Sequence, residues 1–186
     1  MKKIFCCFVI AILSVFLTSA HAADEGNLLL VKWGPIDGNV LIEGYRGYSY
    51  ANEVSMGISN DCTFTSSSGC EKYFDGLTIT QYASSIGAQL ASFCAKGATL
   101  DEVIIVSLIS AKSPIPLWEI KLEPVIIQKI SSAMNTTDGF LWEAVEVLPI
   151  KIKWLFYTYD PQGEPTGYRC TEWNSETGAV DPYCKP

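Results

Sequence analysis

The chain is almost without histidine. Its 186 residues include one, His21, which lies in an apolar N-terminal segment. The rest of the chain therefore has no histidine for a Ser-His or Cys-His dyad, for zinc ligation or for acid–base catalysis. The sequence also has no GxSxG, P-loop, GxGxxG, HExxH or SxxK motif. These absences exclude the common hydrolase and nucleotide-binding classes, so the sequence predicts no enzyme, no cofactor and no metal site.

Basic residues are also scarce, with 13 Lys and Arg against 20 Asp and Glu and a net charge of −7. The clustered basic residues, Lys151 and Lys153, alternate with isoleucines on an expected strand. Nucleic-acid binding needs a stripe that neutralises phosphates, and the sequence predicts none. Paired carboxylates can carry hydrolysis without histidine, so an exported hydrolase that uses them remains a separate hypothesis. The candidates are spaced as on the solvent faces of strands: Asp101, Glu102, Glu119, Glu123, Glu143 and Glu146.

Residues 1–22 have the composition of a cleavable signal peptide. Lys2 and Lys3 precede an apolar run over 4–17, and a small-x-small site ends at Ala22. The run is shorter than the roughly 20 residues that a membrane-spanning helix needs. We therefore predict cleavage between Ala22 and Ala23 and a secreted or periplasmic protein with no stable membrane insertion. An uncleaved N-terminal anchor is the alternative.

Five of the seven cysteines follow the leader. Cys62 and Cys70 flank a small polar loop, and Cys170 and Cys184 bracket a polar segment with Gly and Pro. Pairing within each local group is the simplest of the three connectivities that four cysteines allow. Export favours disulfides over free or metal-bound thiols. Cys94 is left over and, on the apolar face of the expected helix, is predicted to be a buried small hydrophobe.

The pattern of apolar residues predicts a mainly β chain with one helix. Thr80 as N-cap and Gly97 as C′ residue delimit a helix over about 80–96, and Gly87 within it would permit close packing against a sheet. Ser59 to Gly76 is rich in turn residues. Aromatic or β-branched runs predict about seven strands, at 28–33, 45–58, 103–109, 117–122, 125–130, 140–148 and 150–159. The last 25 residues, from Gln162, look like a loop-rich appended tail.

The order of these elements resembles the haemolysin-coregulated protein (Hcp) family, the tube proteins of type VI secretion systems. The local resemblances lie in LTITQYA at 77–83, LASFCAKG at 90–97 followed by LDE at 100–102, PLWEIKLEPVIIQKIS at 116–131, and the segment 143–167 with its end FYTYDPQGEPTG. The resemblance implies an antiparallel β-barrel with one flanking helix. It also implies hexameric rings that stack into a tube and carry small effectors, with no catalytic residue or cofactor.

We therefore expect a signal peptide at 1–22, an Hcp-like β-barrel domain at 23–167 and a disulfide-pinned tail at 168–186. The leader, the paired cysteines and a short loop over 35–44 depart from the family pattern. They leave a second hypothesis, a monomeric exported binding module that acts on an envelope or host partner. Its surface would include Tyr45, Tyr48 and Tyr50, which ordinary strand packing also explains.

Overall fold

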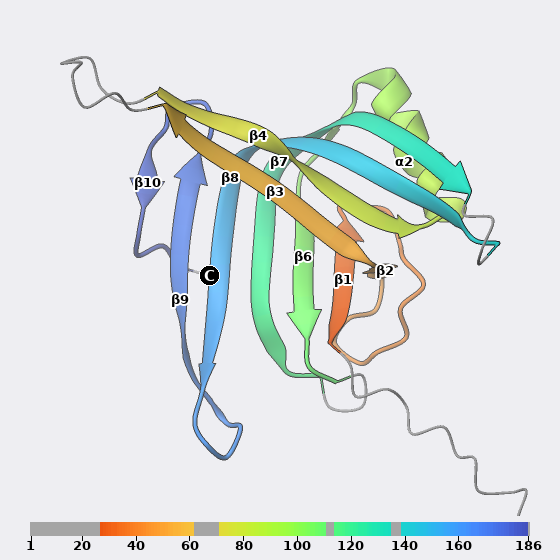
Figure 1. Ribbon diagram of the computed structural model, residues 1–186. Coiled ribbons are helices and arrows are strands. Elements are labelled where there is room, and N and C mark those ends of the chain that lie inside the picture. The colour runs from red at the N-terminus through yellow and green to blue at the C-terminus, as the bar shows by residue number, and fades with distance from the viewer. Residues whose placement is uncertain (1–26, 62–70, 111–113, 135–138, 186) are drawn as a thin grey trace, which may run out of the picture.

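The computed structural model describes residues 27–61, 71–110, 114–134 and 139–185, which form a mainly β fold with one helix (Figure 1). The helix is α2 (Ser85–Lys96), and the strands are β1 (Leu28–Trp33), β2 (Ser49–Ala51), β3 (Glu53–Asp61), β4 (Glu71–Tyr82), β5 (Thr99–Leu100), β6 (Val103–Leu108), β7 (Pro116–Met134), β8 (Leu141–Tyr159), β9 (Pro165–Asn174) and β10 (Val180–Asp181). In these ranges no helix is long and apolar enough to cross a membrane. The leader, its cleavage site and the pair Cys62 and Cys70 lie outside the described residues.

The antiparallel sheet closes into a barrel because β8 has two partners along one edge. Its residues 142–147 pair with β4 and its residues 151–159 with β9, while its other edge pairs with β7. From β7 the order continues through β6 and β1 to β2. β2 and β3 are separated by Asn52 alone, whose N–H donates to the Thr80 carbonyl at 2.8 Å. Since β3 pairs with β4, the strands return to β8 around a barrel that is open between β2 and the end of β4. The expected mainly β class with one helix is confirmed.

β7 and β8 are each 19 residues long and run through a proline. The prediction of separate strands on either side of each proline was therefore wrong. Pro149 lies where β8 changes partner from β4 to β9, and Pro124 lies where β7 changes partner from β6 to β5. Where a strand changes partner along one edge, the residue at the change has no backbone hydrogen bond to a neighbouring strand on that edge. A residue without an N–H is therefore tolerated within a strand.

The helix begins five residues later than the sequence pattern indicates. Thr80 belongs to β4 and pairs with Ala144, so it is not the N-cap. Ser84 is the N-cap instead, and its Oγ accepts a hydrogen bond from the Ile86 N–H at 3.3 Å. Gly97 has φ of 61° and ends the helix in the left-handed conformation, as predicted. Cross-strand pairing to β8 thus prevails over the helical spacing that began at Tyr82.

Two further expectations needed correction. The turn-rich segment 59–76 contains the ends of β3 and β4, which form an extended hairpin. The C-terminal segment is not an appended loop, because β9 pairs with β8 from Lys151 to Tyr159 (Figure 1). The boundary expected at 167/168 falls inside β9.

The barrel interior holds one large apolar cluster, against which α2 packs through Ile86 and Leu90. A polar chain crosses it: Trp33 Nε1 donates to Gln81 Oε1 at 3.3 Å, and Gln81 Nε2 donates to Glu143 Oε2 at 3.5 Å. Glu143 is only 8 % exposed. An added Cβ on Gly87 would lie 2.1 Å from this carboxylate. Gly87 is therefore the residue that lets α2 approach the sheet, as its position in the sequence suggested.

Replacing Gly87 with alanine tests this contact. We expect Gly87→Ala to lower the free energy of unfolding by about 1–3 kcal/mol, because the Glu143 carboxylate must leave its buried position. In a Glu143→Ala background the contact is gone, and Gly87→Ala should raise stability by about 1 kcal/mol through helix propensity. Urea unfolding of the four proteins in this cycle measures both effects. Equal effects of Gly87→Ala in both backgrounds would contradict this explanation.

Candidate functional site

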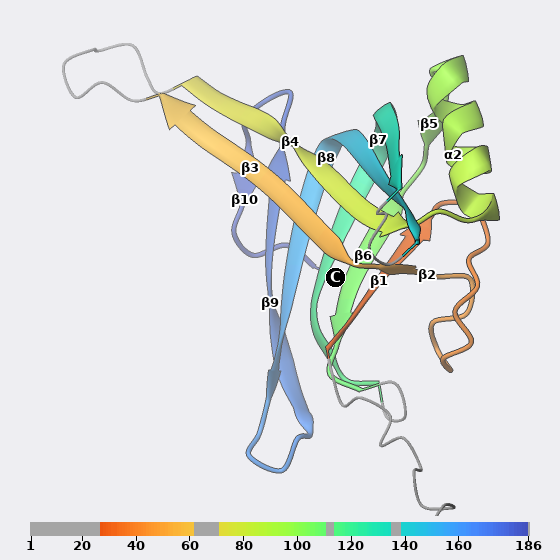
Figure 2. The same cartoon turned by 45° about the vertical axis from the view of Figure 1, so that its right-hand side comes forward.

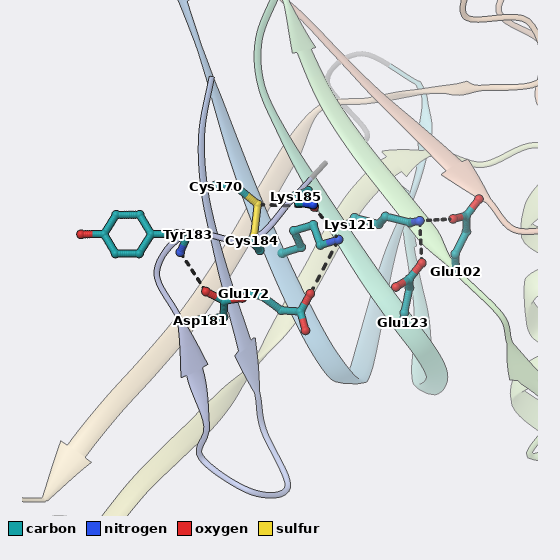
Figure 3. A network of polar contacts seen from close by, with 10 residues as sticks. Glu102, Lys121, Glu123, Cys170, Glu172, Asp181, Tyr183, Cys184 and Lys185 are labelled. Carbon is teal, nitrogen blue, oxygen red and sulfur yellow. Dashed lines mark hydrogen bonds and ion pairs between the residues drawn. A yellow bond between two sulfur atoms is a disulfide. The ribbon is translucent and has the colours of Figure 1, made fainter. Parts of the chain in front are cut away.

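Charged side chains form a row across the face of the sheet opposite the core, here called the outer face. The register sets Lys121 of β7 beside Lys153 of β8, and Lys153 beside Glu172 of β9. Carboxylates offset the repulsion between the lysines. Lys121 Nζ lies 3.0 Å from Glu102 and 2.6 Å from Glu123, and Lys153 Nζ lies 3.6 Å from Glu172 (Figure 3). Hydrogen bonds to Glu123 and Glu102 raise the pKa of Lys121.

Partly exposed pairs of this kind contribute about 1 kcal/mol or less each. The row therefore stabilises the outer face modestly and fixes its lysines in place. The row includes two of the carboxylates that the sequence offered as catalytic candidates, Glu102 and Glu123. A third, Glu146, pairs with Lys129 at 2.7 Å outside the row.

Residues 175–185, here called the strap, contain β10 and then return to the outer face of β8 and β9. A disulfide joins Cys170 of β9 to Cys184 in the strap, with 5.3 Å between their Cα atoms. The Lys185 carbonyl accepts a hydrogen bond from Lys153 Nζ at 3.1 Å, so the strap also contacts the charged row (Figure 3). Leu155, which pairs with Cys170 across the ladder, is buried. The C-terminus is thus fixed to the sheet by one covalent and several polar contacts.

The loop over 34–48 covers the other end of the outer face. Its Val40 packs with Leu30, Val106 and Leu108 in a second apolar cluster, beside which Tyr45 and Tyr48 lie with their rings edge to face at 5.4 Å. Burial, followed by the nearby Glu119 charge, raises the pKa of Tyr48 to about 12. Two of the three tyrosines proposed for a binding surface therefore pack against the protein itself. Tyr50 differs, because it is 45 % exposed on β2.

A small cavity of about 150 Å³ lies between β2 and the end of β4, next to the start of α2. Figure 2 shows that these three elements lie close together. Ser49 and Gln81 line it, and both are almost fully buried. Sequence reasoning missed this feature. Ser49 and Gln81 carry no motif, and only the pairing of distant strands brings them together.

The described ranges contain no group of three or more His, Cys, Asp or Glu residues that could hold a metal ion. The free Cys94 is partly buried and packs against the main core, in keeping with its expected role as a small hydrophobe. The arrangement of residues thus offers surfaces and a small cavity for binding.

The fold of the described residues is similar to that of several solved structures. The chain is similar to a structure described as a type six secretion system protein, with a TM-score of 0.74, 15% identity and coverage of 83% of this chain and 99% of that one. It is also similar to Hcp1 from Salmonella typhimurium (TM-score 0.68, 17% identity, 84% and 99% covered). It is similar as well to a type VI secretion system effector from Yersinia pestis, with a TM-score of 0.62, 16% identity and coverage of 78% of this chain and 98% of that one.

The family model for the type VI secretion system effector Hcp matches residues 29–156. The chain therefore belongs to the Hcp family, as its sequence resemblance indicated, and is an Hcp-like structural protein of the type VI secretion type. No curated protein matches the chain. The match ends before β9, so the strap and its disulfide lie beyond the part of the chain that defines the family.

The disulfide can be tested by substitution. Cys184→Ser should lower the free energy of unfolding by about 2.5–3 kcal/mol, because the bridge closes a loop whose ends are 14 residues apart. Thermal unfolding without reductant measures the loss. Cys94→Ala, which removes a free thiol, is the matched control and should change stability by about 1 kcal/mol or less. A Cys184→Ser protein as stable as the parent would show that the strap adds nothing to the fold.

Glu119 predicts a pH dependence of stability. Burial raises the pKa of this carboxyl above its ordinary 4.5, and Glu102 adds to the effect while Lys121 and Lys153 oppose it. Because the pKa in the folded state lies above 4.5, the free energy of unfolding begins to fall as the pH rises past 4.5. The loss is complete once the pH exceeds the folded-state pKa. Glu119→Gln should therefore be more stable than the parent at about pH 7, by under about 1 kcal/mol, and equally stable at about pH 3.

Urea unfolding at both pH values checks this. The Glu119→Gln protein carries no titrating group at this position, so it is the reference for the parent's loss. A variant less stable than the parent at neutral pH would contradict the argument, because it would mean that the carboxylate makes a net favourable contact.

Proposed function

We propose that this Hcp-family chain is an exported structural protein that assembles into hexameric rings able to stack into a tube. The observation that carries the proposal is the match to the Hcp family model over residues 29–156, which covers most of the barrel. The family's role needs no cofactor and no catalytic group, because its function lies in self-association. Small effectors carried in the ring lumen, and other type VI components, are the partners that this role implies.

Two unpaired strand edges support self-association. In the described part of the chain β3 pairs with β4 alone, and residues 165–171 of β9 pair with β8 alone. Long free edges invite pairing with another chain, and a ring satisfies them through heterologous contacts that close. About half of each apolar side chain near these edges is exposed: Ile58 and Tyr73 on the β3–β4 hairpin, and Phe156 and Tyr168 on the β8–β9 hairpin.

We therefore propose that the β3–β4 hairpin of one protomer contacts the β8–β9 hairpin of the next. Exposed apolar side chains on both hairpins suit an interface core. The two surfaces are different, as a head-to-tail ring requires.

The leader and the disulfides belong to the same proposal. A signal peptide cleaved between Ala22 and Ala23 would deliver the chain to an oxidising compartment, where the Cys170–Cys184 bridge is stable. The second pair, Cys62 and Cys70, which lies between β3 and β4 in the sequence, would form a bridge in the same compartment.

Light scattering coupled to size exclusion, with intact mass, tests the assembly on protein recovered from the exported fraction. We expect a mass near six protomers, each beginning at Ala23. A monomer at micromolar concentration would reject the ring and favour the second hypothesis, an exported binding module. A protomer that retains residues 1–22 would reject cleavage without affecting the ring.

Phe156→Lys and Ile58→Lys test the proposed contact. Each should yield monomers of unchanged thermal stability, because a charge at a half-exposed position of either hairpin opposes docking but leaves the core intact. Gln89→Lys, on the exposed side of α2, is the matched control and should still form rings. If both Phe156→Lys and Ile58→Lys still form rings, the contact between protomers lies elsewhere.

A further inference from the structure

The barrel closes incompletely between β2 and the end of β4. A backbone hydrogen bond from Asn52 to Thr80 joins the two sides at one end. Beyond it, toward Ser49 and Tyr82, β2 is paired with β1 and β4 with β8, and the register of the sheet includes no pair between β2 and β4. The cavity of about 150 Å³ occupies this gap, here called the seam.

The floor of the seam is polar and buried. Ser49 is 4 % exposed and Gln81 is 1 % exposed, and both are on the side of their strands that faces the core. Gln81 is held in place by Trp33 and Glu143 through the two ends of its amide. The Ser49 hydroxyl is buried and has no hydrogen-bond partner among the residues that the structure describes. Leaving a buried hydroxyl unpaired is unfavourable, so at the edge of a cavity this group can pair with a bound molecule.

The two sides of the seam are aromatic. Tyr50 on β2 and Tyr82 on β4 line the cavity, and both are close to half exposed. The Tyr82 ring is fixed by its neighbours, since its centroid lies 4.2 Å from that of Trp142 and 5.2 Å from that of Phe140. The seam therefore has a rigid aromatic wall on one side and a tyrosine on the other.

The seam lining carries no charged side chain. Asn39 and Ser84 add further amide and hydroxyl groups at its rim, and the remaining lining residues are Ala83 and Ile86. A phosphate, a carboxylate or an ammonium group would therefore be desolvated there without a counter-charge. A ligand suited to the seam is neutral, has several hydroxyl groups and presents an apolar face to a ring.

We propose that the seam is a binding site for a neutral sugar residue. The sugar's C–H groups would lie against the negative faces of the tyrosine rings, and its hydroxyls would pair with Ser49 and the amides. The volume suits a single pyranose ring and exceeds the roughly 30 Å³ of one water molecule. The proposal goes beyond the proposed function and does not rest on it, because every residue involved belongs to one protomer.

Saturation-transfer difference NMR on the full-length protein tests the proposal, with glucose, galactose, mannose and N-acetylglucosamine as probes. We expect at least one to bind saturably with a Kd in the millimolar range, about 1–10 mM, as is reasonable for a small open site. Glucuronate is the matched charged probe, and it should bind more weakly than glucose because its carboxylate finds no counter-charge.

Substitutions locate the binding. Tyr50→Ala should weaken it about tenfold, whereas Tyr50→Phe keeps the ring and should retain it. Ser49→Ala should weaken it about threefold or more, and it leaves no new unpaired group, so the fold should be unaffected. Tyr183→Ala, in the exposed strap, is the control and should bind like the parent.

Two results would overturn the proposal. If none of the four sugars gives a saturable signal up to about 50 mM, the seam holds water only. If a sugar binds and neither Tyr50→Ala nor Ser49→Ala weakens it, the site lies elsewhere. Neither result bears on the ring, whose test is the mass of the assembly.

Discussion

The barrel depends on the division of β8 between two neighbours. One strand edge pairs first with β4 and then with β9, so a single chain segment joins the closed barrel to the C-terminal hairpin. Pro149 lies at the junction, where one edge needs no donor. Because β8 also pairs with β7 from Leu141 to Phe156, the neighbouring strands are positioned relative to this strand.

A second constraint is the buried polar chain from Trp33 through Gln81 to Glu143. It occupies the end of the barrel where α2 docks, and Gly87 is the point at which helix and carboxylate come closest. Gln81 also lines the seam, so this polar chain extends from the helix to the cavity. There the Ser49 hydroxyl has no hydrogen-bond partner among the described residues.

The outer face of the sheet is covered at both ends by other parts of the chain. The loop over 34–48 covers one end with an apolar cluster, and the strap covers the other with a disulfide and a hydrogen bond from Lys153. Between these two ends, ion pairs with carboxylates offset the repulsion between Lys121 and Lys153. The disulfide joins β9 to the strap, and both lie beyond the residues that the family model matches.

The amino-acid sequence by itself determined the mainly β class, the helix end at Gly97 and the family, because these follow from local residue patterns and their order along the chain. It misplaced the helix start and split two long strands at prolines, since cross-strand pairing outweighs local spacing at Thr80, Pro124 and Pro149. Of the scattered carboxylates that it offered, Glu102, Glu123 and Glu146 form ion pairs in the fold, and Glu143 makes a buried contact. The seam was decided by tertiary structure alone, because Ser49 and Gln81 are 32 positions apart and meet only when the barrel closes.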